Sequence, residues 1–181
     1  MQVAVSFDSS EAINIAGPDH YDLRADPREL DRIEPARRLV ALRSFLLGVN
    51  VGDSPFATVG CKVWKETAGE AAENHVCASR VDLIFLRESA NFGRGPYEDL
   101  ARRLAELLER EPGETVRAEL RQIPARFPVD NRGYCLRLIL YARGATPEQA
   151  EVRLGLGLAR VQQALMFVAR VLRQQGGFVQ D

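Results

Sequence analysis

With 181 residues, of which 46% are hydrophobic and 27% charged, and a formal net charge of −1, the chain has the composition of an ordinary soluble globular protein, which excludes a disordered or fibrous class. The length suits a single domain over residues 1–181 that buries a core without disulfides or metals. No apolar run approaches the roughly 20 residues that cross a bilayer, so we expect no membrane partner.

The charge is unevenly spread along the chain. Residues 1–35 hold eight acidic residues and three arginines, whereas residues 36–181 hold 17 acidic and 21 basic residues. The segment 17–34 is acidic, contains Pro18 and Pro27 and shows no sustained apolar period, so we predict an acidic arm or long loop. Its negative charge makes it a candidate to shield a basic surface of the same domain.

The N-terminal segment lacks the basic region of a secretory signal peptide, which predicts a cytoplasmic protein. Cys61, Cys77 and Cys135 lack CxxC spacing, so buried reduced thiols are the favoured interpretation. A redox pair of Cys61 and Cys77 across a hairpin is the alternative. With two histidines in the chain, the residues Asp19, His20, Asp22 and His75 give little support to a metal site. We expect no metal and no cofactor.

Periodicity predicts the first elements. Residues 2–7 alternate as a short strand, and Pro35 begins a helix whose apolar residues recur at spacings of three and four. Residues 56–66 and 76–88 are predicted as the two strands of a hairpin. The apolar side chains expected on one face of these strands are Ala57, Val59, Cys61, Val63, Val81, Leu83 and Phe85.

A second helix and a second hairpin follow. Residues 97–108 share an apolar helical face, and Pro112 and Gly113 end the helix. Residues 115–123 and 133–143 alternate as two strands joined by a turn. The residues expected to face the core are Val116, Ala118, Leu120, Leu136, Leu138 and Leu140.

The last segment has two possible structures. Alternation with Gly155 and Gly157 around residues 154–158 suggests a strand. The residues Thr146, Pro147 and Gln149 instead form a helix start, which favours a long C-terminal helix. Glycines inside a helix cost roughly 1 kcal/mol each, so they predict the close approach of another backbone. The buried stripe of this helix is expected to be Leu154, Leu158, Val161, Leu165, Val168 and Leu172.

These elements predict an α+β fold. Two hairpins build an antiparallel sheet, three helices pack against it, and the last helix is the long C-terminal one. Leu156, Phe167 and Val171 lie on a second apolar flank of that helix, away from the buried stripe. We predict a homodimer through this flank, with cover by the first helix of the same chain as the alternative.

The loop Asn91–Pro96, NFGRGP, precedes a helix N-terminus and contains Arg94, which suits a small anion. It lacks the lysine and hydroxyl residues of a P-loop and the spacing of a dinucleotide-binding motif. A plain connection between strand and helix is the favoured interpretation. An enzyme or ligand-binding domain for a small anion or nucleotide, centred on this loop, is an alternative function.

The second hairpin carries the most basic surface. Residues 115–143 hold six arginines against Glu119 and Asp130. We predict a non-catalytic binding or adaptor protein that self-associates and binds an acidic protein partner through this face; a nucleic-acid-binding module that uses the same arginines is the alternative. The residues predicted to bind are Arg117, Arg121, Arg137, Tyr141 and Arg143, together with Arg94.

Overall fold

Six strands and a set of helices make up the computed structural model, which describes residues 1–7, 9–15, 21–50, 52–67, 74–110, 115–128 and 131–174. The strands are β1 (Gln2–Ser6), β2 (Ile13–Asn14), β3 (Phe56–Thr67), β4 (His75–Phe85), β5 (Val116–Arg126) and β6 (Arg132–Gly144). The α-helices are α1 (Glu34–Arg38), α2 (Val40–Asn50), α3 (Gly95–Glu109) and α4 (Pro147–Gln174), and the 3-10 helices are η1 (Pro27–Arg32) and η2 (Glu88–Asn91).

The strands form one mixed sheet in the order β1-β5-β6-β4-β3, and β2 also pairs with β5. β3 with β4, β4 with β6, and β5 with β6 are antiparallel, whereas β1 and β2 run parallel to β5. The α+β class is confirmed, but the prediction of a purely antiparallel sheet was wrong. The alternation of residues 2–7 identifies a strand and carries no information about its partner, which lies more than 100 residues later in the chain.

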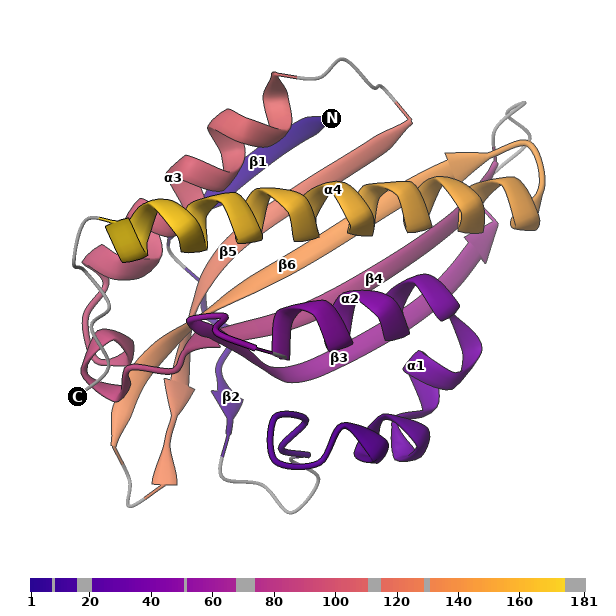
Figure 1. Ribbon diagram of the computed structural model, residues 1–181. Helices are drawn as coiled ribbons and strands as arrows, with labels where there is room; N and C mark the ends of the chain where they lie inside the picture. Colours follow the sequence, from indigo (N-terminus) through magenta and orange to yellow (C-terminus); the bar gives the residue numbers. More distant parts are fainter. Residues whose placement is uncertain are drawn as a thin grey trace.

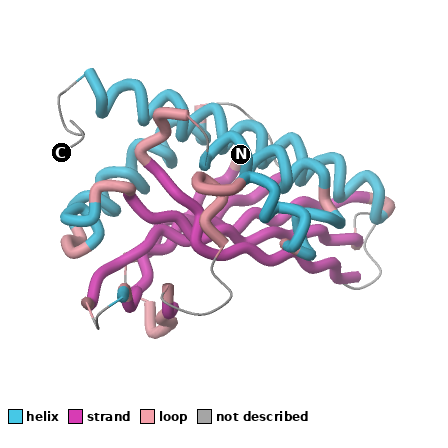
Figure 2. The backbone as a smooth tube through the Cα atoms, turned by 60° about the horizontal axis from the view of Figure 1, so that its bottom comes forward, coloured by secondary structure: helices cyan, strands magenta, loops and turns pink. Residues whose placement is uncertain are grey.

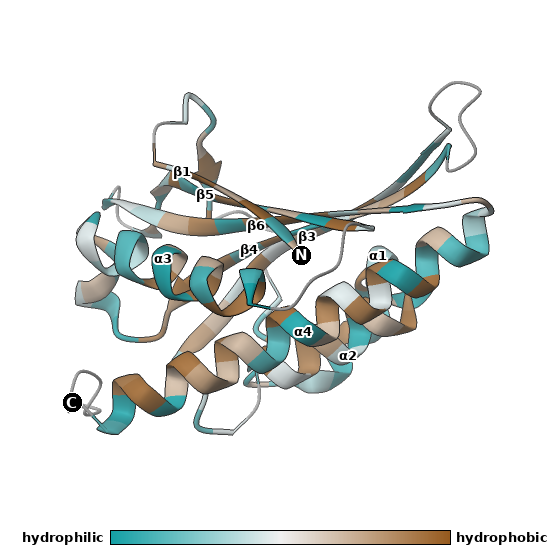
Figure 3. Cartoon of the chain, turned by 90° about the horizontal axis from the view of Figure 1, so that it is seen from above, coloured by the Kyte–Doolittle hydropathy of each residue, from teal (hydrophilic) through white to brown (hydrophobic). Residues whose placement is uncertain are grey.

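The helices cover one face of this sheet (Figures 1 and 2). α4 lies along β6 and β4, with α2 on one side of it and α3 on the other. Figure 3 shows that the opposite face of the sheet carries no helix of comparable length in the described part of the chain. We call this second surface the open face. None of the described helices is both long and apolar enough to cross a lipid bilayer.

The predicted first helix is divided into two. α1 ends at Arg38, Leu39 adopts an extended conformation, and α2 begins at Val40. Leu39 is nevertheless buried in the core, as are Leu42, Phe45, Leu46 and Val49 of α2. The apolar spacing therefore identified the buried face correctly, although the helical period continues across a break in the helix.

The C-terminal helix is confirmed. Its start has the predicted cap, because the backbone N–H of Gln149 donates to Thr146 Oγ1 at 3.2 Å and Gln149 Oε1 accepts from the Ala145 N–H at 2.7 Å. Both helical glycines mark close contacts. A Cβ at Gly155 would lie 3.1 Å from Ala41 Cβ of α2, and one at Gly157 would lie 2.9 Å from Val116 Cγ1 of the sheet. The buried residues on this helix include Leu154, Leu158, Val161, Leu165 and Val168.

One face assignment in β3 was wrong. The pairing of β3 with β4 shifts between Thr58 and Gly60, as in a β-bulge. Cys61 and Val63 therefore pack against the main core under the helices, whereas Val59 belongs to a second apolar cluster on the open face. An inserted residue reverses the alternation that follows it, which the sequence pattern of residues 57–63 does not reveal.

The second cluster closes one end of the open face. Its buried members come from the residue after β2, from the C-terminal part of β5 and the residue that follows it, and from the start of β6. The backbone N–H of Ile15 donates to the Arg126 carbonyl at 2.9 Å, which extends the pairing of β2 with β5. The buried residues of the cluster are Ile15, Ile123, Ala125, Phe127 and Cys135.

Residues 17–20 of the predicted acidic arm lie outside the described residues. From Tyr21 onward the segment packs against the domain, since Leu23 and Leu30 are buried in the main core. Its acidic side chains have nearby partners: Asp26 pairs with Arg28, Glu29 with Arg32, and Asp31 with Arg43 of α2. These carboxylates are already engaged by arginines outside the sheet.

Candidate functional site

The open face combines aromatic and charged side chains. Cross-strand pairing places Trp64, Ala78, Tyr141 and Arg117 in one row across β3, β4, β6 and β5. The rings of Trp64 and Tyr141 meet edge to face, with centroids 5.9 Å apart and an interplanar angle of 83°. Both rings lie above Ala78, which is fully buried.

A network of alternating charges crosses this face from β5 to β4. Glu119 pairs with Arg117 at 3.0 Å and with Arg121 on its other side. Arg121 continues to Glu11, 3.6 Å away, in the segment between β1 and β2, and Glu11 also pairs with Arg137. The network ends at β4, where Arg137 and Arg80 both contact Asp82.

The prediction that Arg137 is part of a solvent-exposed basic face was wrong. Its side chain is 4% exposed and that of Asp82 is 2% exposed. Nε donates to Asp82 Oδ1 at 2.7 Å and Nη2 donates to Asp82 Oδ2 at 3.1 Å, a bidentate pair. The alternation of β6 places Arg137 on the open face correctly, but Glu11 and the neighbouring strands cover it. Arg137 is part of the structure of the sheet and does not offer its charge to a partner.

The other predicted residues of this hairpin lie on the open face as expected. Arg117 and Arg143 are exposed, and Arg121 and Tyr141 are half-buried. Arg117 and Arg121 share the carboxylate of Glu119, so their charge is partly neutralised. The structure therefore brings Arg117, Arg121 and Tyr141 together and separates Arg94 from them.

A second basic surface lies at the end of β5 and β6 next to the NFGRGP loop. Arg126 and Arg132 are exposed and directly opposite each other across the two strands. Neither forms an ion pair with an acidic residue in the described ranges. Like charges in this position destabilise a sheet. Together with Phe92, Arg94 and Tyr134, these two arginines line a hollow of about 420 Å³, which we call the hairpin-end surface.

Within the NFGRGP loop, Asn91 and Arg94 have different roles. Asn91 is buried and bonds to the end of β4, where its Nδ2 donates to the Phe85 carbonyl and its Oδ1 accepts from the Phe85 N–H, both at 2.9 Å. Arg94 is exposed, donates from Nε to the Tyr134 hydroxyl at 3.1 Å and lies 5.5 Å from the centre of that ring. The loop is thus bonded to the end of β4 through Asn91, and its other end, with Arg94, is exposed to solvent.

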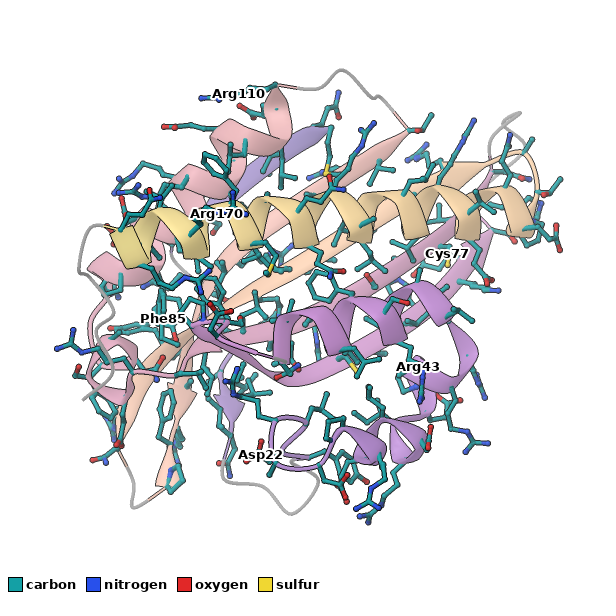
Figure 4. All side chains as sticks on the ribbon, in the orientation of Figure 1. Asp22, Arg43, Cys77, Phe85, Arg110 and Arg170 are labelled. Carbon is teal, nitrogen blue, oxygen red and sulfur yellow. The ribbon has the colours of Figure 1, made fainter. Side chains whose placement is uncertain are left out.

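The cysteines do not form the redox pair that we considered. Cys61 pairs with Val81 and Cys77 with Lys65, so the two thiols are separated by four positions of the ladder, roughly 13 Å at the strand rise. Figure 4 labels Cys77 and Phe85 toward opposite ends of β4. Burial raises the pKa of Cys61 to about 11 and also raises the pKa values of Cys77 and Cys135. These thiols are therefore protonated near neutral pH.

In the described part of the chain, no three His, Cys, Asp or Glu side chains gather in a group that holds a metal ion. The considered residues Asp19 and His20 lie outside the described ranges.

Comparison of the chain with models of protein families, with curated protein sequences and with solved structures found no match.

Proposed function

We propose that this chain is a cytoplasmic, single-domain, non-catalytic binding protein that self-associates through α4 and holds an acidic segment of a protein partner. The observation that carries the binding proposal is the opposed pair Arg126 and Arg132 at the hairpin-end surface. A carboxylate placed between them relieves their mutual repulsion. The three cysteines form no disulfide, which fits a reducing compartment.

The surroundings of this pair support an acidic polypeptide as the ligand. Phe92 and Tyr134 offer apolar rings beside the guanidinium groups, so the aliphatic parts of a bound segment also find contacts. The antiparallel pairing of β3 with β4 and of β5 with β6 supports the interpretation of two hairpins, with this surface at the end of the second. On the open face Arg143 adds an exposed charge, whereas Arg117 and Arg121 already share Glu119.

We expect a fluorescein-labelled hexaglutamate peptide with an amidated C-terminus to bind the full chain with an affinity that falls as salt rises. The double variant Arg126→Glu, Arg132→Glu should weaken binding at least about tenfold, because it replaces the attracting charges by repelling ones. Fluorescence anisotropy measures both effects. The matched control is Arg102→Glu, Arg110→Glu, which makes the same charge change on exposed positions of α3 and at its end (Figure 4).

The control variant should bind the peptide about as tightly as the unmodified chain. Equal weakening by both double variants would show that only net charge matters and would contradict a defined site. A labelled oligothymidylate tests the other class of polyanion. Tighter binding of this strand than of the peptide, with the same dependence on Arg126 and Arg132, would identify a nucleic acid, in place of an acidic protein, as the ligand.

Self-association is supported by apolar side chains that the protomer leaves uncovered. On α4, Leu156 is 62% and Phe167 is 53% exposed, and Val152 and Met166 are also exposed. Leu156 and Phe167 are 11 positions apart, roughly three helical turns, and so lie on the same side of the helix. A two-fold axis near the middle of α4 places Leu156 of each copy against Phe167 of the other, an isologous contact. Phe167 and Arg170 line a hollow of about 420 Å³ there, and Figure 4 labels Arg170 on this outer face.

We expect the chain to be a dimer whose population rises with concentration, and Leu156→Glu and Phe167→Glu each to give monomers, because a carboxylate would be buried without a partner in the interface. Light scattering after size exclusion measures the mass. Leu86→Glu is the matched control, since Leu86 is 41% exposed and belongs to the segment after β4 and not to α4. A monomeric unmodified chain at about 100 μM, some hundredfold above a dissociation constant of about 1 μM, would contradict this interface.

A further inference from the structure

A cavity of about 400 Å³ lies between the bulge of β3 and the segment that contains η1 and the start of α1. β3 is the last strand on its side of the sheet, and η1 and α1 lie next to it (Figure 1). The volume falls in the range of about 300–1,000 Å³ that is usual for small-molecule sites. The described residues that give the cavity an apolar wall are Ile15, Leu23, Ile33, Leu46 and Val59.

Arg80 of β4 brings guanidinium donors to this cavity without a matching acceptor. The residue lines the cavity, and its Nε is buried and forms no hydrogen bond with the described part of the chain. Asp82 lies 3.6 Å from this Nε, which makes an ion pair but is too long for a hydrogen bond. Both oxygens of Asp82 already accept from Arg137. A buried donor without an acceptor is unfavourable, so this position favours a ligand that brings an acceptor.

The charge next to Arg80 is also positive. Lys62 stands directly opposite Arg80 across β3 and β4 and makes no ion pair with the residues that the structure describes. Like charges in opposed positions of a sheet repel each other, and Asp82, which already has a bidentate partner, does not balance both. Glu34 also lines the cavity, but its carboxylate pairs with Arg38. The side of the cavity formed by Arg80 is therefore suited to an anion.

We propose that this cavity binds a small amphiphilic carboxylate, a molecule with one carboxylate group and an apolar body. The carboxylate takes the planar donor fork of Arg80, because a guanidinium group presents its N–H donors in the geometry of two carboxylate oxygens. The apolar body lies against Ile33, Leu46 and Val59, and Tyr21 adds an aromatic ring to the same wall. The ligand thus meets both the unsatisfied donor and the apolar surface of the cavity.

Three small probes test the cavity directly. 4-Phenylbutyrate has the carboxylate and the apolar body, 4-phenylbutanamide has the same body without the charge, and acetate has the carboxylate without the body. In an NMR titration of the ¹⁵N-labelled full chain, 4-phenylbutyrate should bind at least about tenfold more tightly than either of the others. Equal affinity of 4-phenylbutyrate and one of the other probes, or no binding of 4-phenylbutyrate, would overturn the proposed site.

Two variants with the same change of charge assign the binding to Arg80. Arg80→Gln should weaken the binding of 4-phenylbutyrate at least about tenfold, because it removes the charged donor fork. Arg143→Gln, at an exposed position of the open face, should leave the affinity unchanged. Thermal unfolding of each variant verifies that it is folded. The same affinity in Arg80→Gln and in the unmodified chain would overturn the proposed site.

Cys61 provides a second readout that needs no variant. This half-buried residue lines the cavity, whereas Cys77 and Cys135 are buried. Burial raises the pKa of Cys61 to about 11, so its modification by methyl methanethiosulfonate is measured by mass spectrometry at about pH 9, where some thiolate is present. 4-Phenylbutyrate at about ten times its dissociation constant should slow this reaction about tenfold. An unchanged rate at Cys61 would place the probe elsewhere and overturn the proposed site.

The carboxylate site goes beyond the proposed function, because neither Arg126 nor Arg132 lines this cavity. In the double variant Arg126→Glu, Arg132→Glu, 4-phenylbutyrate should keep its affinity within about twofold, while the amidated hexaglutamate peptide loses its own. A parallel loss of both ligands would overturn a separate carboxylate site. Binding of 4-phenylbutyrate without binding of the peptide to the unmodified chain would overturn the proposed function alone.

Discussion

Replacing Asp82 by alanine is expected to lower the free energy of unfolding by about 3–5 kcal/mol. Asp82 is the main partner of Arg137, whose side chain is 4% exposed, and the two are joined by hydrogen bonds of 2.7 and 3.1 Å. Without the carboxylate, a guanidinium group stays buried in the middle of the sheet beside a half-exposed Glu11. Urea unfolding at pH 7 measures the loss as a shift of the midpoint with an unchanged slope.

Two further variants define the origin of this effect. Glu11→Ala removes the second carboxylate at Arg137, and because Glu11 is half exposed its loss should cost less than about 1 kcal/mol. The double variant Asp82→Leu, Arg137→Met removes the buried charges together and should recover most of the stability lost in Asp82→Ala. A loss below about 1 kcal/mol in Asp82→Ala would contradict a buried, mutually dependent pair.

This pair also shows what local sequence patterns omit. The alternation in residues 133–143 assigned Leu136, Leu138 and Leu140 to the core and Arg137 to the other face, and the structure confirms both assignments. Alternation does not say whether the other face is open or covered. The groups that cover Arg137 are Asp82, 55 positions away in the chain, and Glu11, 126 positions away, so no pattern within β6 contains them.

The helices were predicted better than the sheet, because the signals that start a helix are local whereas strand pairing joins distant segments of the chain. The start of α4 is encoded within a few residues, since Thr146 and Gln149 cap the helix locally. The parallel pairing of β1 with β5 is instead decided by contacts between distant segments. The bulge at Thr58 and Gly60 has no signal in the apolar spacing of β3. Within the candidate site, the local pattern identified arginines, but only the fold shows that Arg126 and Arg132 keep their charge available.

Asn91 illustrates a residue whose role the sequence analysis missed. Its place in a glycine-rich loop before a helix suggested an anion site, yet its side chain is buried and joined to three groups. It bonds to both backbone groups of Phe85 at 2.9 Å, and its Oδ1 also accepts from the Tyr97 hydroxyl at 2.5 Å. Asn91 thus ties the end of β4 to the first turn of α3, and it holds in position the loop that carries Arg94.

Asn91→Ala is therefore expected to lower the free energy of unfolding by about 2–4 kcal/mol, because it removes the three hydrogen bonds that the buried Asn91 side chain makes with the Phe85 N–H, the Phe85 carbonyl and the Tyr97 hydroxyl. Urea unfolding measures the loss, and hydrogen exchange at the Phe85 amide should become faster. Tyr97→Phe is the matched control: it removes one of the three bonds and leaves both Phe85 bonds intact, so its cost should be about 1 kcal/mol. If the two variants lost the same stability and the Phe85 amide stayed equally protected, the bonds between Asn91 and β4 would not be what fixes this loop.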